Sequence, residues 1–212
     1  MTESKSARNR DRRRQDILRA VLKLLRKHGT GITTAQIAAE ASCSKETLYN
    51  WFGDRDGIMQ ALAEAQAEGM GAALERAWAR ADRASSFAER LEAYSITLLD
   101  ILTGEAVTTV NRLAMADACR EQAQLGLIVL DDWHSKVVSP FVDLLESGAS
   151  EGVVTFDDPE DAFQSLFGLL IGDRQRRLLL GEDARPGADA MQAIAAASLQ
   201  KWFRLYGVAD RT

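Results

Sequence analysis

The chain has few of the residues that crosslink or kink a protein. Two cysteines and three prolines occur in 212 residues. Two cysteines exclude a disulfide framework and fit a reducing compartment, and so few prolines leave room for long uninterrupted helices. A redox-sensing role for Cys119 stays open, although no neighbouring feature marks this thiol as reactive.

Long apolar runs are also missing. The longest, residues 125–130, contains Gly126 and is far too short to span a bilayer. The N-terminus is charged and lacks the apolar segment of a signal peptide. These absences favour a cytoplasmic protein without a membrane partner.

Patterns typical of catalysis are sparse. The histidines are His28 and His134, and no His-x-x-x-His spacing, glycine-rich phosphate loop or Gly-x-Ser-x-Gly elbow occurs. We therefore expect no catalytic residue, no metal site and no cofactor, and an enzyme is disfavoured.

Charge is unevenly distributed along the chain. The net charge is −5, yet residues 1–55 hold twelve Lys and Arg against six Asp and Glu, which is +6 and leaves −11 for the rest. A basic head on an acidic protein is typical of nucleic-acid binders. The five arginines between Arg8 and Arg14 lie just ahead of and at the start of the first expected helix, either as an arm on DNA or as a disordered solubilising tail.

Two short helices separated by a tight turn are predicted near the end of this basic segment. Thr33 and Gln36 fit a capping box, and Ser44 is a good N-cap for the second helix. Leu48 and Phe52 are an apolar i, i+4 pair that would face the core and leave the opposite face polar. That face is either simply solvated, or it enters the DNA major groove as the second helix of a helix-turn-helix does.

Residues between 17 and 58 share a specific spacing with one known family. The matching residues are Ile17, Leu18, Ala20, Leu24, Leu25, Gly29, Thr33, Ile37, Ala38, Ala41, Ser44, Lys45, Thr47, Leu48, Tyr49, Phe52, Arg55 and Ile58. With them, the segment resembles the DNA-binding domain of the tetracycline-repressor (TetR) family of bacterial transcription regulators. The family usually has Gly at the position of Ser42, Val at Cys43 and a small residue at Glu46. The first departure affects the backbone of the turn, and the last bears on DNA sequence preference.

The resemblance also implies which residues contact DNA. They are Thr33, Thr34, Ser44, Lys45, Glu46, Thr47, Tyr49, Asn50, Trp51 and Arg55. Lys45, Glu46 and Thr47 would face bases, and Asn50 would face either bases or phosphates. The residues implied to hold phosphates are Thr33, Tyr49, Trp51 and Arg55.

The whole chain is predicted to be helical, because strand-like alternation is absent. The nine expected helices cover roughly residues 12–28, 33–41, 44–52, 55–83, 86–102, 105–120, 124–147, 158–181 and 188–206. Pro140 would kink the seventh of these helices.

We expect an all-α, two-domain protein with the nine helices usual in the TetR family. A DNA-binding helix-turn-helix domain with a basic arm would occupy residues 1–54, and a helical ligand-binding and dimerisation body would occupy residues 55–212. Much of the segment from Asp157 to Gly181 resembles the body of the AefR-like branch of the family.

Large apolar side chains on more than one face of the last two expected helices indicate an interface as well as a core. The candidate interface residues are Phe163, Phe167, Leu170, Arg174, Trp202 and Phe203. In the TetR family these helices pair across a two-fold axis, which implies a homodimer. Two heads would then bind a palindromic double-stranded DNA site.

The middle helices carry candidates for a small-molecule pocket. They are Tyr94, Leu98, Val110, Leu113, Asp117, Trp133, His134 and Val137. An apolar wall with a few polar groups is typical of a ligand site, and equally of a helical core. For His134 a core or surface position is favoured over ligand contact, although Asp117 and His134 could orient an inducer.

Together these features favour a dimeric, sequence-specific transcription regulator, most simply a repressor that a small-molecule inducer of unknown identity releases from its operator. The alternative is an architectural or constitutive DNA-binding protein without a ligand response. The large acidic body disfavours that alternative, and an activator remains open.

Overall fold

The computed structural model describes residues 2–80, 86–121 and 123–208. Apart from one isolated β-bridge between Val154 and Gly207, these described residues form helices, turns and loops and no strand. The all-α prediction is therefore confirmed. No helix in the described part of the chain is long and apolar enough to cross a membrane.

Contacts divide the chain into two compact units. Unit 1 comprises Met1–Ala67 with Thr109–Leu130, and unit 2 comprises Glu68–Thr108 with Asp131–Thr212. Each unit has its own hydrophobic core.

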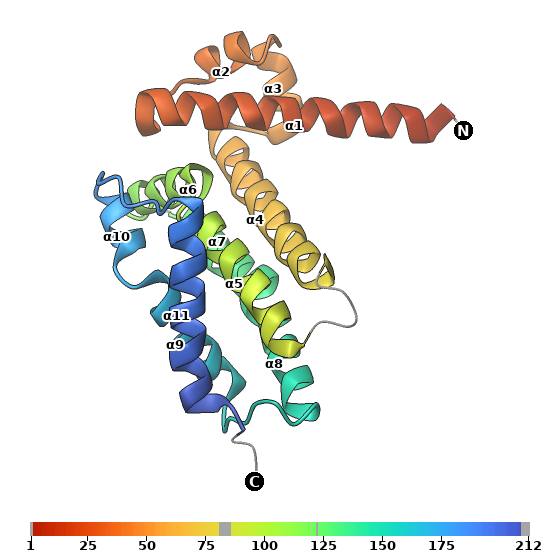
Figure 1. Cartoon of the computed structure of the whole chain (residues 1–212). Helices are drawn as coiled ribbons and strands as arrows, with labels where there is room; N and C mark the ends of the chain where they lie inside the picture. The colour runs from red at the N-terminus through yellow and green to blue at the C-terminus, as the bar shows by residue number, and fades with distance from the viewer. Residues whose placement is uncertain (1, 81–85, 122, 209–212) are drawn as a thin grey trace. The chain divides into compact units, whose positions relative to one another are not determined.

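Unit 1 is built around the two short helices that the sequence predicted. It contains α1 (Thr2–His28), the 3-10 turn η1 (Gly29–Gly31), α2 (Thr34–Glu40), α3 (Lys45–Phe52), the first part of α4 (Arg55–Arg80), and most of α6 (Glu105–Asp117) and α7 (Leu125–Trp133) (Figure 1). Ile17 and Val21 on α1, Ile37 on α2 and Leu48 on α3 are fully buried in one core. Burial of the apolar side of α3 fixes which of its residues remain at the surface.

Unit 2 is a helical bundle with an aromatic core. It contains the rest of α4, α5 (Phe87–Leu102), the π-helical turn η2 (His134–Val138), α8 (Ser139–Ser150), α9 (Pro159–Ile171), α10 (Arg174–Leu179) and α11 (Ala188–Tyr206). Within it, α11 packs against both α9 and α5 (Figure 1). The Phe141 ring lies 5.0 Å from that of Tyr94 and 5.1 Å from that of Phe163. The buried Trp202 donates its Nε1–H to the Ala162 carbonyl at 2.8 Å, so its polar group is satisfied.

The helix that was expected to run to Gly181 is shorter than predicted. It ends at Ile171, because Gly172 adopts a φ of +54° that terminates an α-helix. The separate short helix α10 follows. With α7, η2 and α8 counted as one run, the described residues hold ten helices rather than nine.

Two further expectations are corrected in detail. α1 begins at Thr2, so the arginines between Arg8 and Arg14 lie within a helix rather than ahead of one or at its start. The bend expected at Pro140 takes the form of the π-helical turn η2, directly before α8. Proline has no N–H to donate to the Lys136 carbonyl, which favours a wider local hydrogen-bond pattern.

Candidate nucleic-acid interface

Side-chain caps determine where the two short helices of unit 1 begin. Gln36 N donates to the Thr33 hydroxyl at 3.3 Å, and Thr33 N donates to Gln36 Oε1 at 2.8 Å. At the start of α3, Thr47 N donates to the Ser44 hydroxyl at 3.0 Å. The predicted capping box and the predicted N-cap are both confirmed.

The turn between α2 and α3 contains a strained residue. Ser42 has a φ of +49° and is the single non-glycine residue with positive φ in the described chain. This agrees with the expectation that glycine would suit the position better. The Arg13 guanidinium on α1 donates to the carbonyls of Ala41 at 2.9 Å and Ser42 at 2.8 Å. The turn is therefore held by an arginine whose role the sequence did not reveal.

One face of α3 is left open to solvent. Lys45, Glu46, Tyr49 and Asn50 are exposed, whereas Leu48 is the buried residue of the helix. Lys45 and Glu46 have no hydrogen bond or ion pair with any described residue, so their charges are available to a ligand such as DNA. Lys45 and Glu46 thus combine charge and exposure, and Tyr49 and Asn50 add exposed hydrogen-bonding groups to the same face.

The other implied DNA contacts apart from Arg55 lie next to this face. Thr33 and Ser44 are exposed caps, Thr34 and Thr47 are half-buried in the first turns, and Trp51 packs partly against the core of unit 1. The hydroxyls of Thr34 and Tyr49 lie 3.4 Å apart, which joins α2 to α3 at the surface. Their role in DNA binding stays a prediction.

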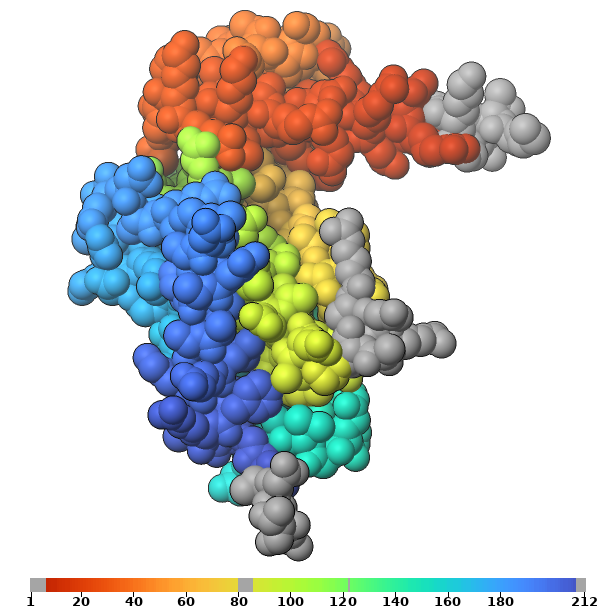
Figure 2. All heavy atoms as spheres, viewed as in Figure 1, coloured from red at the N-terminus to blue at the C-terminus, as the bar shows by residue number. Residues whose placement is uncertain are grey.

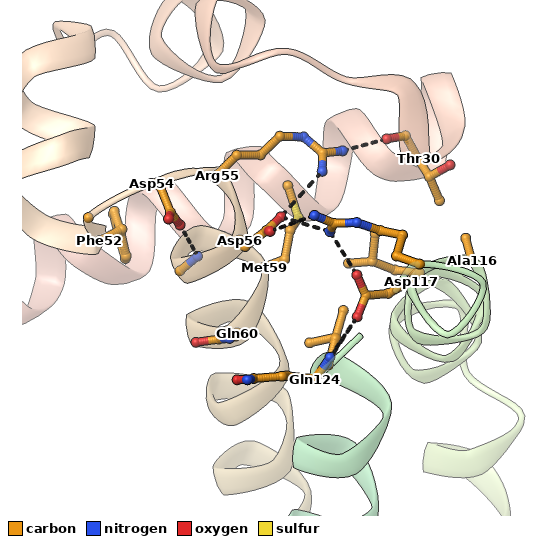
Figure 3. Close-up of a pocket in the computed structure, with 15 residues that line it drawn as sticks. Thr30, Phe52, Asp54, Arg55, Asp56, Met59, Gln60, Ala116, Asp117 and Gln124 are labelled. Atoms are coloured by element: carbon orange, nitrogen blue, oxygen red, sulfur yellow. Dashed lines mark hydrogen bonds and ion pairs between the residues drawn. The ribbon is translucent and has the colours of Figure 1, made fainter. Parts of the chain in front are cut away.

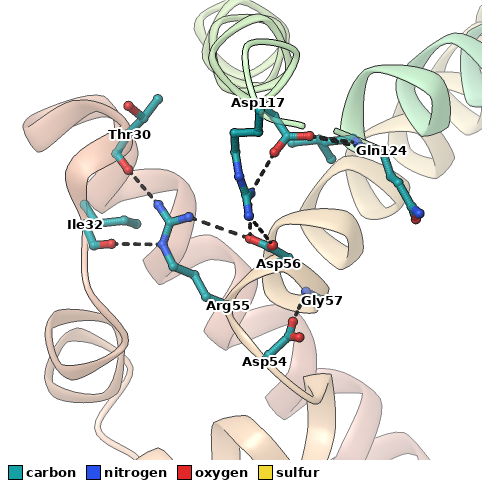
Figure 4. Close-up of polar contacts among 10 residues, drawn as sticks. Thr30, Ile32, Asp54, Arg55, Asp56, Gly57, Asp117 and Gln124 are labelled. Atoms are coloured by element: carbon teal, nitrogen blue, oxygen red, sulfur yellow. Dashed lines mark hydrogen bonds and ion pairs between the residues drawn. The ribbon is translucent and has the colours of Figure 1, made fainter. Parts of the chain in front are cut away.

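The Arg55 side chain is hydrogen-bonded to backbone carbonyls of unit 1 (Figure 4). Its guanidinium donates to the Thr30 carbonyl at 2.7 Å and to the Ile32 carbonyl at 3.3 Å, and it lies 3.9 Å from the Asp56 carboxylate. These contacts tie the first turn of α4 to the end of η1. The implied phosphate contact therefore competes with an internal role for the same side chain.

A chain of charges joins α4 to the start of α7 within unit 1 (Figure 4). Arg120 contacts the Asp56 carboxylate at 2.9 Å and the Asp117 carboxylate at 2.8 Å. Asp117 also accepts from the backbone N–H groups of Gln124 at 3.2 Å and Leu125 at 3.1 Å. The hydrogen bond from Arg120 lowers the pKa of Asp56, and the two carboxylates raise the pKa of Arg120. Asp117, predicted as a ligand anchor, thus serves here as a cap.

A cavity of about 540 Å³ lies beside this network in unit 1 (Figure 3). Leu113 and Asp117 of the predicted ligand set line it. Its carboxylates are already engaged, since Asp54 accepts from the Gly57 N–H at 2.8 Å while Asp56 and Asp117 hold Arg120. The cavity therefore offers few unsatisfied polar groups to a ligand.

A second cavity, of about 420 Å³, lies in unit 2. Trp78, Tyr94 and Leu144 supply much of its apolar wall, and Glu75 and Lys136 are among its charged residues. Tyr94 is the member of the predicted ligand set that lines it. The sequence had not singled out the α4 residues of this wall, because no local pattern distinguishes them from other residues of an amphipathic helix.

The predicted ligand residues are distributed over both units. Val110, Leu113 and Asp117 belong to unit 1, whereas Tyr94, Leu98, Trp133, His134 and Val137 belong to unit 2. Leu98 and Val137 are buried in the core of unit 2, and His134 is exposed, in agreement with the favoured interpretation of this histidine. A single pocket formed by all of these residues stays a prediction.

The predicted interface residues differ in exposure. Phe163, Leu170 and Trp202 are at most 1% exposed and fill the core of unit 2 without a second chain. Phe167 and Phe203 are half-buried. The half-buried Arg174 donates to the carbonyls of residues 170 and 171, where α9 ends. The core positions already have an intramolecular role, so Phe167 and Phe203 are the aromatic candidates for an interface.

Two capped helices with an exposed polar face, carried by an all-α chain, define a helix-turn-helix DNA-binding protein. The profile of bacterial regulatory proteins of the tetR family matches residues 17–62, and that of the AefR-like transcriptional repressor C-terminal domain matches residues 89–208. The chain belongs to the TetR family of transcription regulators, and the family prediction is confirmed.

Solved structures of other regulators support this assignment. A TetR transcriptional regulator from Agrobacterium tumefaciens is 35% identical over 92% of this chain and 94% of its own, with a TM-score of 0.76. A TetR-family regulator from Mesorhizobium loti MAFF303099 has a TM-score of 0.83 at 22% identity, over 93% of this chain and 98% of its own. The Flavonoid-responsive Regulator FrrA has a TM-score of 0.71 at 20% identity, over 95% of this chain and 100% of its own. The last two show the shared fold alone. Among curated proteins, none matches the chain.

Proposed function

We propose that this TetR-family regulator is a homodimeric repressor that binds a palindromic operator and releases it when a small molecule binds the body. Residues 1–54 would form the DNA-binding domain, and residues 55–212 would carry ligand binding and dimerisation. The proposal rests on the open face of α3, whose exposed Lys45 and Glu46 have no partner in the described chain. No catalytic role is proposed.

Glu46 is proposed to read a base. A carboxylate in the major groove accepts a hydrogen bond from the amino group of cytosine, and a misfit costs about 1–3 kcal/mol per base pair. Operators selected by Glu46→Ala from a random pool should therefore show one relaxed position in each half-site. Glu64→Ala removes an exposed carboxylate elsewhere in unit 1 and serves as the control. An unchanged selected site for Glu46→Ala would make this residue a solvated helix position.

The same selection separates the repressor from the architectural alternative. A regulator binds its selected palindrome far more tightly than unrelated DNA at a fixed salt concentration. An architectural protein binds both sequences alike, with one salt dependence. Equal affinities at about 150 mM salt would favour the alternative.

The proposed dimer uses the outer faces of α9 and α11. Figure 2 shows that α11 forms much of the visible surface of unit 2 in this view. Phe203 on α11 is half-buried, so part of its ring is available to a second chain. Phe203→Glu would bury an uncompensated charge in a shared interface and should give monomers in sedimentation experiments. Leu180→Glu changes a residue that is 82% exposed and lies outside these helices, and it should stay dimeric.

Circular dichroism completes the test of the dimer. The Phe203→Glu monomers should remain helical and lose operator affinity, because one head reads only half of the site. A helical variant that stays dimeric would move the interface to another surface of unit 2.

The inducer is proposed to enter the cavity of unit 2. The helix α4 starts at Arg55, directly after the helix-turn-helix in the sequence, and continues to Arg80. Residues in its second half line the cavity, so this one helix connects the cavity to the DNA-binding segment along the chain. A ligand that favours a state with lower operator affinity must, by linkage, bind less tightly when operator is present. A coupling of about 1–3 kcal/mol alters occupancy about 5–150-fold.

Filling this cavity by mutation tests the site without knowledge of the ligand. Ala72→Trp places a large side chain into the cavity, whereas Ala79→Trp adds the same group to an exposed position of α4 that does not line it. Ala72→Trp should lower operator affinity or abolish induction, and Ala79→Trp should do neither. Flavonoids belong in the first ligand panel, since one structural neighbour carries that response in its name. An Ala72→Trp variant that folds and responds as the parent does would exclude this cavity.

A further inference from the structure

Four elements of unit 2 line the cavity that we propose for the inducer, and one of them is α8, which contributes Leu144. The α4 helix contributes Glu68, Glu75 and Trp78, α5 contributes Tyr94, and the π-helical turn before α8 contributes Lys136. At about 420 Å³, the space falls within the range of small-molecule sites. The chemistry of these side chains narrows the class of molecule that would fit.

Tyr94 lines this cavity, and its buried hydroxyl is an unsatisfied polar group. Tyr94 is 1% exposed, its ring packs on Phe141 at 5.0 Å, and its oxygen has no hydrogen-bond partner. Burial raises the pKa of Tyr94, so the hydroxyl stays protonated and can both donate and accept. A buried hydroxyl without a partner is unfavourable, and a bound molecule that supplies one removes that cost.

Negative charge predominates around the same space. Glu68 and Glu75 are two helical turns apart on α4 and therefore lie on one side of it. The Lys136 ammonium lies 2.6 Å from the Glu68 carboxylate, so the opposite charges of this ion pair offset each other. Glu75 has no ion-pair partner among the described residues. The cavity rim is left with one uncompensated carboxylate, which disfavours an anion and favours a cation.

The other cation nearby does not cancel this charge. The Arg90 guanidinium stacks on Trp78 at 4.7 Å from the ring centroid, but it does not line the cavity. Its charge is paired with the Glu151 carboxylate at 3.0 Å. The carboxylate of Glu75 therefore remains the free charge of the lining.

The backbone of Lys136 lies next to α4. A Cβ atom at Gly71 of α4 would lie 3.4 Å from the Lys136 carbonyl and 3.5 Å from its Cβ, which is ordinary van der Waals contact between α4 and the π-helical turn. Single π-helical turns are frequent at functional sites. The pair of Lys136 with Glu68 lies at the exposed edge of the cavity, since these side chains are 35% and 69% exposed.

We infer that the cavity of unit 2 binds a small organic cation with an aromatic body, whose positive group faces Glu75 and whose second polar group bonds to the Tyr94 hydroxyl. This inference rests on the proposed function, because it specifies the ligand class of the proposed inducer site. Trp78 and Tyr94 line the same cavity as the exposed Glu75, and aromatic rings attract cations.

Three acridines that differ in charge test the inference. At pH 7.5 the probes are 9-aminoacridine as the cation, acridine as the neutral ring and acridine-9-carboxylate as the anion. Binding to the full-length protein is measured by titration calorimetry without DNA, because acridines intercalate. The cation should bind saturably and at least about tenfold more tightly than the anion.

Two variants and one control assign the contacts. Glu75→Gln should weaken the cation about three- to fivefold and leave the neutral ring unchanged. Tyr94→Phe removes the hydroxyl alone and should weaken the cation about fivefold without lowering thermal stability, because the lost group had no partner. Glu146→Gln removes an exposed carboxylate of unit 2 outside the cavity and should bind as the parent does.

The outcomes separate this inference from the proposed function. A cation that fails to bind saturably, an anion that binds as tightly, or an unchanged affinity in Glu75→Gln or Tyr94→Phe overturns the ligand class. Operator affinity and the effect of Ala72→Trp are measured independently of these probes. A protein that binds the cation as expected but shows no preference for its selected palindrome would retain the site and lose the proposed regulation.

Discussion

Arg55→Ala distinguishes an internal brace from a phosphate contact. The substitution removes two hydrogen bonds from a charged donor to the carbonyls of Thr30 and Ile32, at 2.7 and 3.3 Å. Such bonds are worth about 1.5–3 kcal/mol each where water is excluded. The Arg55 side chain is 37% exposed, so solvent screens part of this gain. We expect a loss of about 1–2 kcal/mol in the free energy of unfolding of unit 1 for both bonds together.

Tryptophan positions make this loss measurable. Trp51 is the tryptophan of unit 1, and the other three lie in unit 2. Fluorine NMR of protein labelled with 5-fluorotryptophan therefore follows each unit through urea unfolding, with the Trp51 signal assigned by Trp51→Phe. Arg19→Ala removes an arginine whose side chain is 69% exposed, and it should change stability by less than about 0.5 kcal/mol.

The salt dependence of operator binding tests whether Arg55 contacts a phosphate instead. Each lost phosphate contact reduces the magnitude of the slope of log K against log salt by about 0.9. An internal Arg55 predicts an unchanged slope together with reduced stability. Unchanged stability with a shallower slope would refute the internal role and return Arg55 to the DNA backbone.

Three other substitutions test separate features of the structure. Ser42→Gly should stabilise unit 1 by about 0.5–1 kcal/mol in urea unfolding, because glycine adopts a positive φ without steric cost; a loss of stability would argue against strain. Arg120 holds the pKa of Asp56 below its usual 3.8, so this pair stabilises at neutral pH and its contribution is lost as pH falls through the lowered pKa. Asp56→Asn should accordingly flatten the fall of the urea midpoint below about pH 4, and an unaltered profile would contradict the linkage. Trp202→Phe removes the hydrogen bond to the Ala162 carbonyl and leaves a gap in the core, and calorimetry should show unit 2 destabilised by about 2–3 kcal/mol; a change below about 0.5 kcal/mol would contradict this.

Local chemistry determined the starts of several helices. The capping box at Thr33 and the cap at Ser44 are present as predicted, and the helices expected to start near residues 86 and 158 begin at a capping box on Ser86 and a cap on Asp158. A cap needs only a short side chain and a free backbone N–H two or three residues later, so sequence alone contains the information. The unfavourable position of Ser42 was indicated by the resemblance, because the TetR family usually has glycine there, and Ser42 has a positive φ.

Contacts between residues distant in sequence were decided by tertiary structure. Arg13 reaches the carbonyl of Ser42, and Arg120 reaches Asp56, across 29 and 64 residues. Exposed arginines have many partners of similar energy, and packing of the helices selects among them. The assignment of Val110 to the core of one unit and Tyr94 to a cavity of the other follows from the same packing.

The sequence by itself determined an all-α chain, the caps of its helix-turn-helix and the polar residues at the surface of α3. Periodicity and capping depend on neighbours within about one helical turn, which the sequence lists in order. Tertiary structure decided which cavity is lined by Glu75 and Tyr94, that the Tyr94 hydroxyl is buried without a partner, and which aromatic residues fill the core. Those properties depend on how whole helices pack, because burial and the loss of a hydrogen-bond partner arise only when distant segments exclude water together.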